Sequence, residues 1–277
     1  MMMKNLSIIL FPMLLSVLFV QCSGENQAEP AQEKAIKPTK NEPFDKRYKS
    51  EIESKLKIGD KEKYSYHVYK AFINADSIED AIITVNRMQF AEDEAIKSGK
   101  VTKAVEMGYV GTYNYFFYYD GAIDQISEPI TVPSSPGREL DISFASITSP
   151  DKQDIIIDYR IRNSGWRSYF TSTNEGHLSL MFQWKWFDHV GEAVPEALNH
   201  VLEPSPEGQS QDIAIYQSTI DDYNPEVGDV YAYMPKITKK GALMYRFFYD
   251  PAVSKYRIYS PQMLNDLGLT AVGPLKR

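Results

Sequence analysis

The chain has 277 residues, with 30 Lys and Arg against 37 Asp and Glu, and its formal net charge is −7 at pH 7. An acidic protein without a long basic segment is poorly suited to nucleic acid or to an anionic lipid surface, so we expect neither as a partner. A single cysteine excludes an intramolecular disulfide, and with it a small fold stapled by disulfides.

The first 21 residues have the composition of a bacterial export signal. Lys4 gives the start a positive charge, residues 6–20 are nearly all apolar, and the sequence turns polar immediately afterwards. A membrane-spanning helix needs roughly twenty apolar residues, and this stretch is shorter, as in the central region of a signal peptide. We therefore expect residues 1–21 to be a cleaved signal peptide.

The only cysteine, Cys22, directly follows this segment, within Leu-Phe-Val-Gln-Cys-Ser-Gly at residues 18–24. This junction resembles the lipobox of bacterial lipoproteins, whose cysteine becomes the lipidated first residue of the mature chain. Gln21 stands where Gly, Ala or Ser is usual, and the alternative is an ordinary signal peptide that happens to contain a cysteine. The resemblance implies stable membrane attachment through several acyl chains on Cys22. Ser23, in place of an Asp, implies the outer membrane, at its periplasmic face or at the cell surface.

The segment after the cysteine has the composition of a flexible tether. Residues 23–43 contain one large aliphatic residue, Ile36, three prolines and many charges. Such a segment cannot bury enough apolar surface to offset the entropy lost on ordering. We predict that residues 22–43 are a lipidated cysteine with a disordered tether, and that residues 44–277 form a single β-rich exported domain.

Apolar and polar residues alternate along several segments of this domain, as is typical of β-strands. The alternation in residues 178–186 predicts one shared strand face for Leu178, Leu180, Phe182, Trp184 and Trp186. Residues 140–144 and 155–161 alternate in the same way. Together with a 13% content of aromatic residues, this predicts a mainly β fold. We expect antiparallel sheets of repeated hairpins, arranged as an incomplete propeller-like array or as a β-sandwich.

A few helical inserts are expected within this fold. Residues 44–56 and 86–107 are rich in helix-forming residues, and Gly99 is a predicted break in the second. Residues 193–202 form a third predicted helix, because Pro195 falls near its first turn, where proline is tolerated.

Two short patterns recur along the chain. An acidic or amide residue, an Asp and an aliphatic run occur together at residues 79–83, 153–157 and 211–215. An aromatic run that ends in Asp followed by Gly or Pro occurs at residues 116–121 and 246–251. The second pattern is typical of a strand, a tight turn and another strand. We therefore expect the domain to contain internal repeats.

A loop, an Asp and an aliphatic strand followed by an aromatic hairpin resemble the FG-GAP and VCBS repeats of integrin-type β-propellers. In that family the loop before the aliphatic strand binds calcium. Asn74, Asp76 and Asp80 match three of its ligand positions, whereas Phe72 and Ser77 replace the first Asp and the turn Gly. The resemblance thus implies a calcium site, the only cofactor expected. Since calcium takes six to eight oxygen ligands, the alternative is that these side chains only cap a turn.

Motifs of enzymatic chemistry are missing from the sequence. It contains no Gly-x-Ser-x-Gly elbow, no phosphate-binding P-loop, no His-Glu-x-x-His pair and no Gly-x-Gly-x-x-Gly turn. The four histidines are scattered, and none has a neighbour at close ligand spacing. We therefore predict a protein that is not an enzyme, with a hydrolase built from scattered carboxylates as one alternative.

Aromatic residues are the remaining candidates for a functional surface: Trp166, Trp184, Trp186, Tyr113 and Tyr115. Flat aromatic side chains stack on sugars and anchor protein interfaces, and packing in the core is the alternative interpretation. The predicted function is a lipid-anchored binding module of the cell envelope, with a protein or a glycan as its partner. A carbohydrate-binding lipoprotein of a polysaccharide-handling system is the main alternative.

Overall fold

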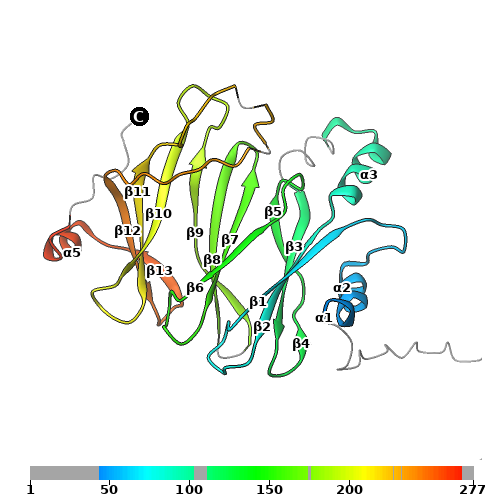
Figure 1. Cartoon of the computed structure of the whole chain (residues 1–277), viewed down its shortest axis with the longest axis horizontal. Coiled ribbons are helices and arrows are strands. Elements are labelled where there is room, and N and C mark those ends of the chain that lie inside the picture. The colour runs from blue at the N-terminus through cyan, green and yellow to red at the C-terminus, as the bar shows by residue number, and fades with distance from the viewer. Residues whose placement is uncertain (1–43, 103–110, 174–175, 227, 232, 270–277) are drawn as a thin grey trace, which may run out of the picture. The chain divides into compact units, whose positions relative to one another are not determined.

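The computed structural model describes residues 44–102, 111–173, 176–226, 228–231 and 233–269. The expected signal peptide, Cys22 and the tether lie outside the described residues. Within them the chain is mainly β and forms two antiparallel sheets, one of five strands and one of eight, which confirms the predicted fold class (Figure 1).

The five-stranded sheet is formed by the first part of the domain. Its strands run in the order β1-β2-β3-β4, and β5 also pairs with β3. The elements in chain order are α1 (Phe44–Arg47), α2 (Lys49–Leu56), β1 (Ser65–Ala71), β2 (Asp80–Asn86), α3 (Met88–Ser98), β3 (Gly111–Asp120), β4 (Gln125–Ile126) and β5 (Ile130–Ser134).

The eight-stranded sheet follows the chain strand by strand from β6 to β13. Its elements are β6 (Asp141–Ala145), β7 (Asp154–Ile161), β8 (Ser164–Ser172), β9 (Leu178–Asp188), β10 (Glu196–Pro204), β11 (Gln211–Ser218), β12 (Leu243–Asp250) and β13 (Lys255–Ile258), followed by α5 (Pro261–Asp266). Strands β9 and β10 pair only through Asp188 with Glu196 and Phe187 with Ala197, whereas β10 and β11 pair along their length. The sheet therefore splits between β9 and β10.

Taken with this split, the strands form three four-stranded meanders: β1 to β4, β6 to β9 and β10 to β13 (Figure 1). The three Asp-aliphatic segments occupy the same place in each, because Asp80, Asp154 and Asp212 lie at the start of the second strand. The two aromatic segments end the third strand of the first and third meanders, and a tight turn and a short fourth strand follow each. The two predicted hairpins are thus present.

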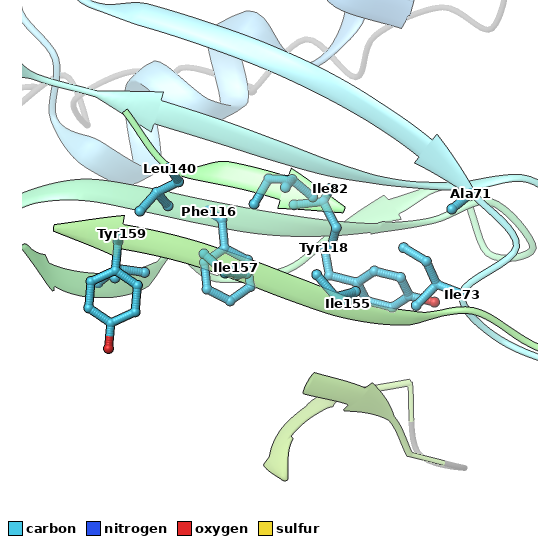
Figure 2. Close-up of a cluster of buried hydrophobic side chains, with 11 residues drawn as sticks. Ala71, Ile73, Ile82, Phe116, Tyr118, Leu140, Ile155, Ile157 and Tyr159 are labelled. Carbon is cyan, nitrogen blue, oxygen red and sulfur yellow. The ribbon is translucent and has the colours of Figure 1, made fainter. Parts of the chain in front are cut away.

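The meanders pack on one another through apolar side chains. One cluster joins the five-stranded sheet to β6 and β7, and Figure 2 shows Phe116, Tyr118 and Ile82 of the first meander beside Ile155 and Ile157 of the second. A second cluster fills the space between the second and third meanders. Helix α2 covers the outer face of the first meander in a third cluster. Each fully buried large apolar side chain contributes about 1.5–3 kcal/mol, so these clusters hold the meanders together.

Two of the three predicted helices are present. Residues 44–56 form α1 and α2, and α3 ends at Ser98 because Gly99 adopts φ +58°, the left-handed conformation that commonly ends a helix. Residues 103–110 of the second predicted helix lie outside the described residues. In the part of the chain that the structure describes, no helix is both long and apolar enough to cross a bilayer.

The helix predicted at residues 193–202 is wrong, because residues 196–202 belong to β10. Leu198 and Leu202 share a face and pack in the second cluster, and Leu198 to Pro204 pair continuously with β11. Pairing with a neighbouring strand thus outweighs the helix propensity of the Ala, Glu and Leu residues.

The single apolar face predicted for residues 178–186 is also wrong. Leu180 pairs with Phe170 whereas Phe182 pairs with Tyr169, so Met181 is the extra residue of a β-bulge. An extra residue reverses the side-chain alternation. Leu180 therefore faces the first meander, and Phe182 packs in the second cluster.

Candidate functional site

The predicted calcium ligands form a network of turn-capping hydrogen bonds. Asp80 is buried, and its Oδ2 accepts from the backbone amides of Ile73 and Asn74, each at 3.1 Å. Asn74 Oδ1 accepts from the amide of Asp76 at 3.2 Å, and Asp76 Oδ1 accepts from that of Ile78 at 2.8 Å. Burial raises the pKa of Asp80 although these amides favour the ionised form. This geometry supports the turn-capping interpretation.

The equivalent loop of the second meander is closed in the same way. Asp154 Oδ2 accepts from the amides of Ile147 at 3.1 Å and Thr148 at 2.6 Å. Asp212 differs, because it accepts from Arg246 Nε at 2.7 Å and from Tyr259 Oη at 3.0 Å. Among the described residues, no group of three or more Asp, Glu, His or Cys side chains is placed to hold a metal ion.

A groove of about 730 Å³ opens where β9 and β10 separate. Its volume falls in the range of ~300–1,000 Å³ that is common for ligand sites. The walls come from β8 and β9 on one side, from the start of β10 on the other, and from the ends of β11 and β12. The lining residues are Trp166, Gln183, Trp184, Lys185, Val194, Pro195, Glu196, Ala197, Leu198, Gln217, Ser218, Met244 and Tyr245.

Three aromatic side chains give the groove its main apolar surface. Trp184 lies 5.3 Å from Tyr245 between ring centroids, with an interplanar angle of 57°, and Trp184 also stacks parallel to Phe182 at 6.0 Å. Trp166 lies on the opposite face of the β8–β9 pair, beside its pairing partner Lys185, whose Nζ is 5.5 Å from the Trp166 ring centroid. All three lining aromatics are partly exposed. They are therefore available to a ligand and held in place by core packing.

Polar side chains are interleaved with these aromatics. Gln183 is exposed and donates from Nε2 to Tyr159 Oη and, at 3.2 Å, to Ser168 Oγ. Lys185 Nζ donates to Asp188. Burial of Asp188 opposes its ionisation, but hydrogen bonds from Lys185 and Ser164 outweigh burial and lower its pKa. The groove thus combines flat apolar surfaces with an amide and an ammonium group held at fixed positions.

Comparisons with protein-family models, with curated proteins and with solved structures find no match. The geometry and chemistry of the groove therefore carry the functional proposal.

His200, on β10, forms a side-chain hydrogen bond to β9 in the region where the backbones of the two strands do not pair. Its Nε2 lies 2.9 Å from the backbone oxygen of Lys185, and its Nδ1 lies 3.3 Å from Tyr169 Oη. Burial, and then the positive charge of Arg167, lower the pKa of His200 to about 3. The ring is therefore neutral, donating from Nε2 to the carbonyl and accepting at Nδ1 from the tyrosine hydroxyl. This side chain therefore links β10 to Lys185 of the groove wall.

The depressed pKa of His200 predicts a pH-dependent stability. As the pH falls below about 6.5, the unfolded chain binds a proton at this histidine that the folded chain excludes until near pH 3. The free energy of unfolding therefore falls with pH across this window. Urea denaturation between about pH 7 and about pH 5 should show a weaker pH dependence for His200→Gln than for the wild type. Equal pH dependence of the two proteins would contradict a neutral His200.

The structure does not bring the five predicted binding aromatics together in one site. Trp166 and Trp184 both line the groove, from opposite faces of the β8–β9 pair. Trp186 lies outside its wall and packs edge-to-face on the buried Phe187, with centroids 4.7 Å apart. Tyr113 and Tyr115 lie on β3, in the other sheet.

The groove residues that sequence reasoning missed include Gln183, Lys185 and Tyr245. Gln183 and Lys185 stand between apolar residues of β9, where alternation assigns them only to the opposite face. Tyr245 alternates with Phe247 along β12, which is a signal for a strand. Nothing in the local sequence places β12 beside β9, so its contact with Trp184 could not be foreseen.

Proposed function

We propose that this chain is a lipid-anchored, non-enzymatic binding module of the cell envelope, and that its ligand binds in the groove between β9 and β10. The observation that carries the proposal is the open groove itself, which Trp184 and Tyr245 line from one face of the β8–β9 pair and Trp166 lines from the other. Concave, largely apolar sites with a few placed polar groups are the usual form of ligand sites. The lipid on Cys22 would hold this site at the outer membrane.

A saccharide is the ligand class that the lining favours. A sugar ring presents an apolar C–H face, which packs on an aromatic ring, and hydroxyl groups around its edge. The groove offers both hydrogen-bond donors and hydrogen-bond acceptors to these hydroxyls. Lys185 supplies donors, Glu196 supplies acceptors, and Gln217 supplies both. Aromatic and polar lining of this kind supports glycan binding.

Trp184 is the residue whose loss should abolish binding, because it lines the groove beside Tyr245 and is partly exposed there. The experiment is a thermal melt of the exported chain carrying Cys22→Ala, with and without a panel of envelope polysaccharides. A ligand at a hundredfold excess over its Kd adds about 2.7 kcal/mol to the free energy of unfolding. We expect an increase in Tm that Trp184→Ala removes.

Tyr113→Ala is the matched control, since Tyr113 is a partly exposed aromatic on the other sheet that contacts Phe90. This variant should keep the full ligand-induced increase in Tm. Two results would contradict the proposal: no increase with any polysaccharide, or an increase that is the same in Trp184→Ala as in the parent chain.

The lipid anchor is tested separately. Cys22 is the only cysteine, so Cys22→Ala removes the acylation site and should move the protein from the membrane fraction to the soluble fraction of exported protein. Fractionation followed by immunoblotting measures this distribution. Tight membrane retention of the variant would overturn the proposed anchor and leave the groove proposal untouched.

A further inference from the structure

A second cavity, of about 270 Å³, lies next to the groove on the face of β9 that looks toward the first meander. Strand β5 forms one wall with Ile130, Val132 and Pro133. The opposite wall is formed by Ile157 of β7, Phe170 of β8 and Leu180 of β9.

Gln183 belongs to the walls of both the cavity and the groove. The β-bulge at Met181 explains how this happens, because it places Leu180 and Gln183 on one face although they are three residues apart. Alternate residues of β8 face the same way. One continuous surface therefore runs from cavity to groove, made of the paired residues Phe170 with Leu180, Ser168 with Gln183 and Trp166 with Lys185.

The lining of the second cavity suits an aliphatic group better than a sugar. Its polar atoms at Tyr159 and Ser168 already form hydrogen bonds with Gln183, and Thr131 is exposed to solvent. The other lining side chains are hydrocarbon. Hydroxyl groups buried there would lose their hydrogen bonds to water, which is unfavourable, whereas each methylene group buried there strengthens binding about fourfold.

We propose that the groove and the second cavity form one two-part site for an acylated or alkylated saccharide. The sugar occupies the groove at the edge of β9, which Trp166 borders from one face of the strand and Trp184 from the other. The aliphatic chain passes Gln183 into the cavity beside Leu180. This inference rests on the proposed function, since it assigns the sugar to the same groove.

The test compares methyl β-D-glucopyranoside with n-octyl β-D-glucopyranoside, the latter below its critical micelle concentration. Titration calorimetry is performed on the exported chain carrying Cys22→Ala. The octyl glycoside should bind at least about tenfold more tightly than the methyl glycoside, because its chain buries methylene groups. Leu180→Trp fills the cavity and should remove this gain while methyl glycoside binding is kept.

A second substitution and a control variant test whether the loss of octyl glycoside binding comes from the cavity and not from misfolding of Leu180→Trp. Leu180→Gln makes the cavity polar at nearly constant size and should also reduce the gain. Val253→Trp adds at least as much bulk at a turn residue that is 48% exposed, and it should leave the gain unchanged.

The outcomes separate the two proposals. Equal affinity for both glycosides, or a gain that persists in both Leu180 variants, overturns the two-part site and leaves the groove intact. Octyl binding that is lost in Leu180→Trp but kept in Trp184→Ala supports the cavity and contradicts the sugar site in the groove. Failure of both glycosides to bind overturns the two-part site, and the polysaccharide melts then decide the groove proposal by themselves.

Discussion

Replacing Arg246 with methionine is expected to lower the free energy of unfolding by about 3–5 kcal/mol, the usual cost of breaking a buried ion pair. Arg246 Nε donates to Asp212 Oδ2 at 2.7 Å, and its Nη1 donates to Glu203 Oε2 at 2.8 Å. The side chains of Arg246 and Asp212 are 8% and 0% exposed. Methionine preserves much of the apolar stem but leaves the carboxylate of Asp212 buried without its cation.

Lys240→Met is the matched control for this experiment. Lys240 Nζ pairs with the same Glu203 at 2.7 Å, but its side chain is 47% exposed. Exposed ion pairs are worth about 0–1 kcal/mol, so urea denaturation should show little change. Combining Arg246→Met with Asp212→Asn should recover part of the loss, because the uncompensated charge is then removed. Equal effects of Arg246→Met and Lys240→Met would contradict the importance of this buried pair.

Asp154→Ala is expected to destabilise the domain by about 2–4 kcal/mol, because it leaves buried backbone donors without an acceptor. The Asp154 carboxylate is fully buried and accepts from the amides of Ile147 and Thr148, and also from Thr148 Oγ1. The loop between β6 and β7 depends on these bonds. Asp154→Asn keeps an acceptor oxygen and should therefore cost less than Asp154→Ala.

Asp151→Ala provides the comparison, since Asp151 is an exposed carboxylate of the same loop. This change should alter the free energy of unfolding by less than about 0.5 kcal/mol. Urea denaturation of the three variants measures the differences. If Asp151→Ala were as destabilising as Asp154→Ala, the loop would depend on its surface charge and not on the buried carboxylate.

Much of the fold could be predicted from periodicity. Alternation at residues 155–161 indicated β7, and the aromatic runs that end at Asp120 and Asp250 indicated hairpins, because strand and turn preferences are local. The segment at residues 193–202 was mistaken for a helix because its composition favours one, while its pairing with β11 is a tertiary property. The β-bulge at Met181 could not be predicted either, because it is defined by the pairing with β8, and the apolar alternation in the sequence continues through it.

The groove could be predicted only in part. Trp166 and Trp184 were candidates by residue type. The pairing of β8 with β9 places them at neighbouring positions on opposite faces, since Trp166 pairs with Lys185 and Trp184 with Arg167. The contact of Trp184 with Tyr245, and the groove that opens where β9 separates from β10, have no signature in the sequence of either strand. Tyr113 and Tyr115 were equally good candidates by composition, but they lie on the other sheet.

The three tryptophans allow the most direct test of ligand binding in the groove. Each indole N–H gives one signal in an NMR correlation spectrum, and single Trp→Phe variants assign the three signals. On titration with a binding polysaccharide, the signals of Trp166 and Trp184 should shift, whereas that of Trp186, which lies outside the groove wall, should stay in place. A shift of the Trp186 signal alone, or no shift in any of the three, would contradict binding in the groove.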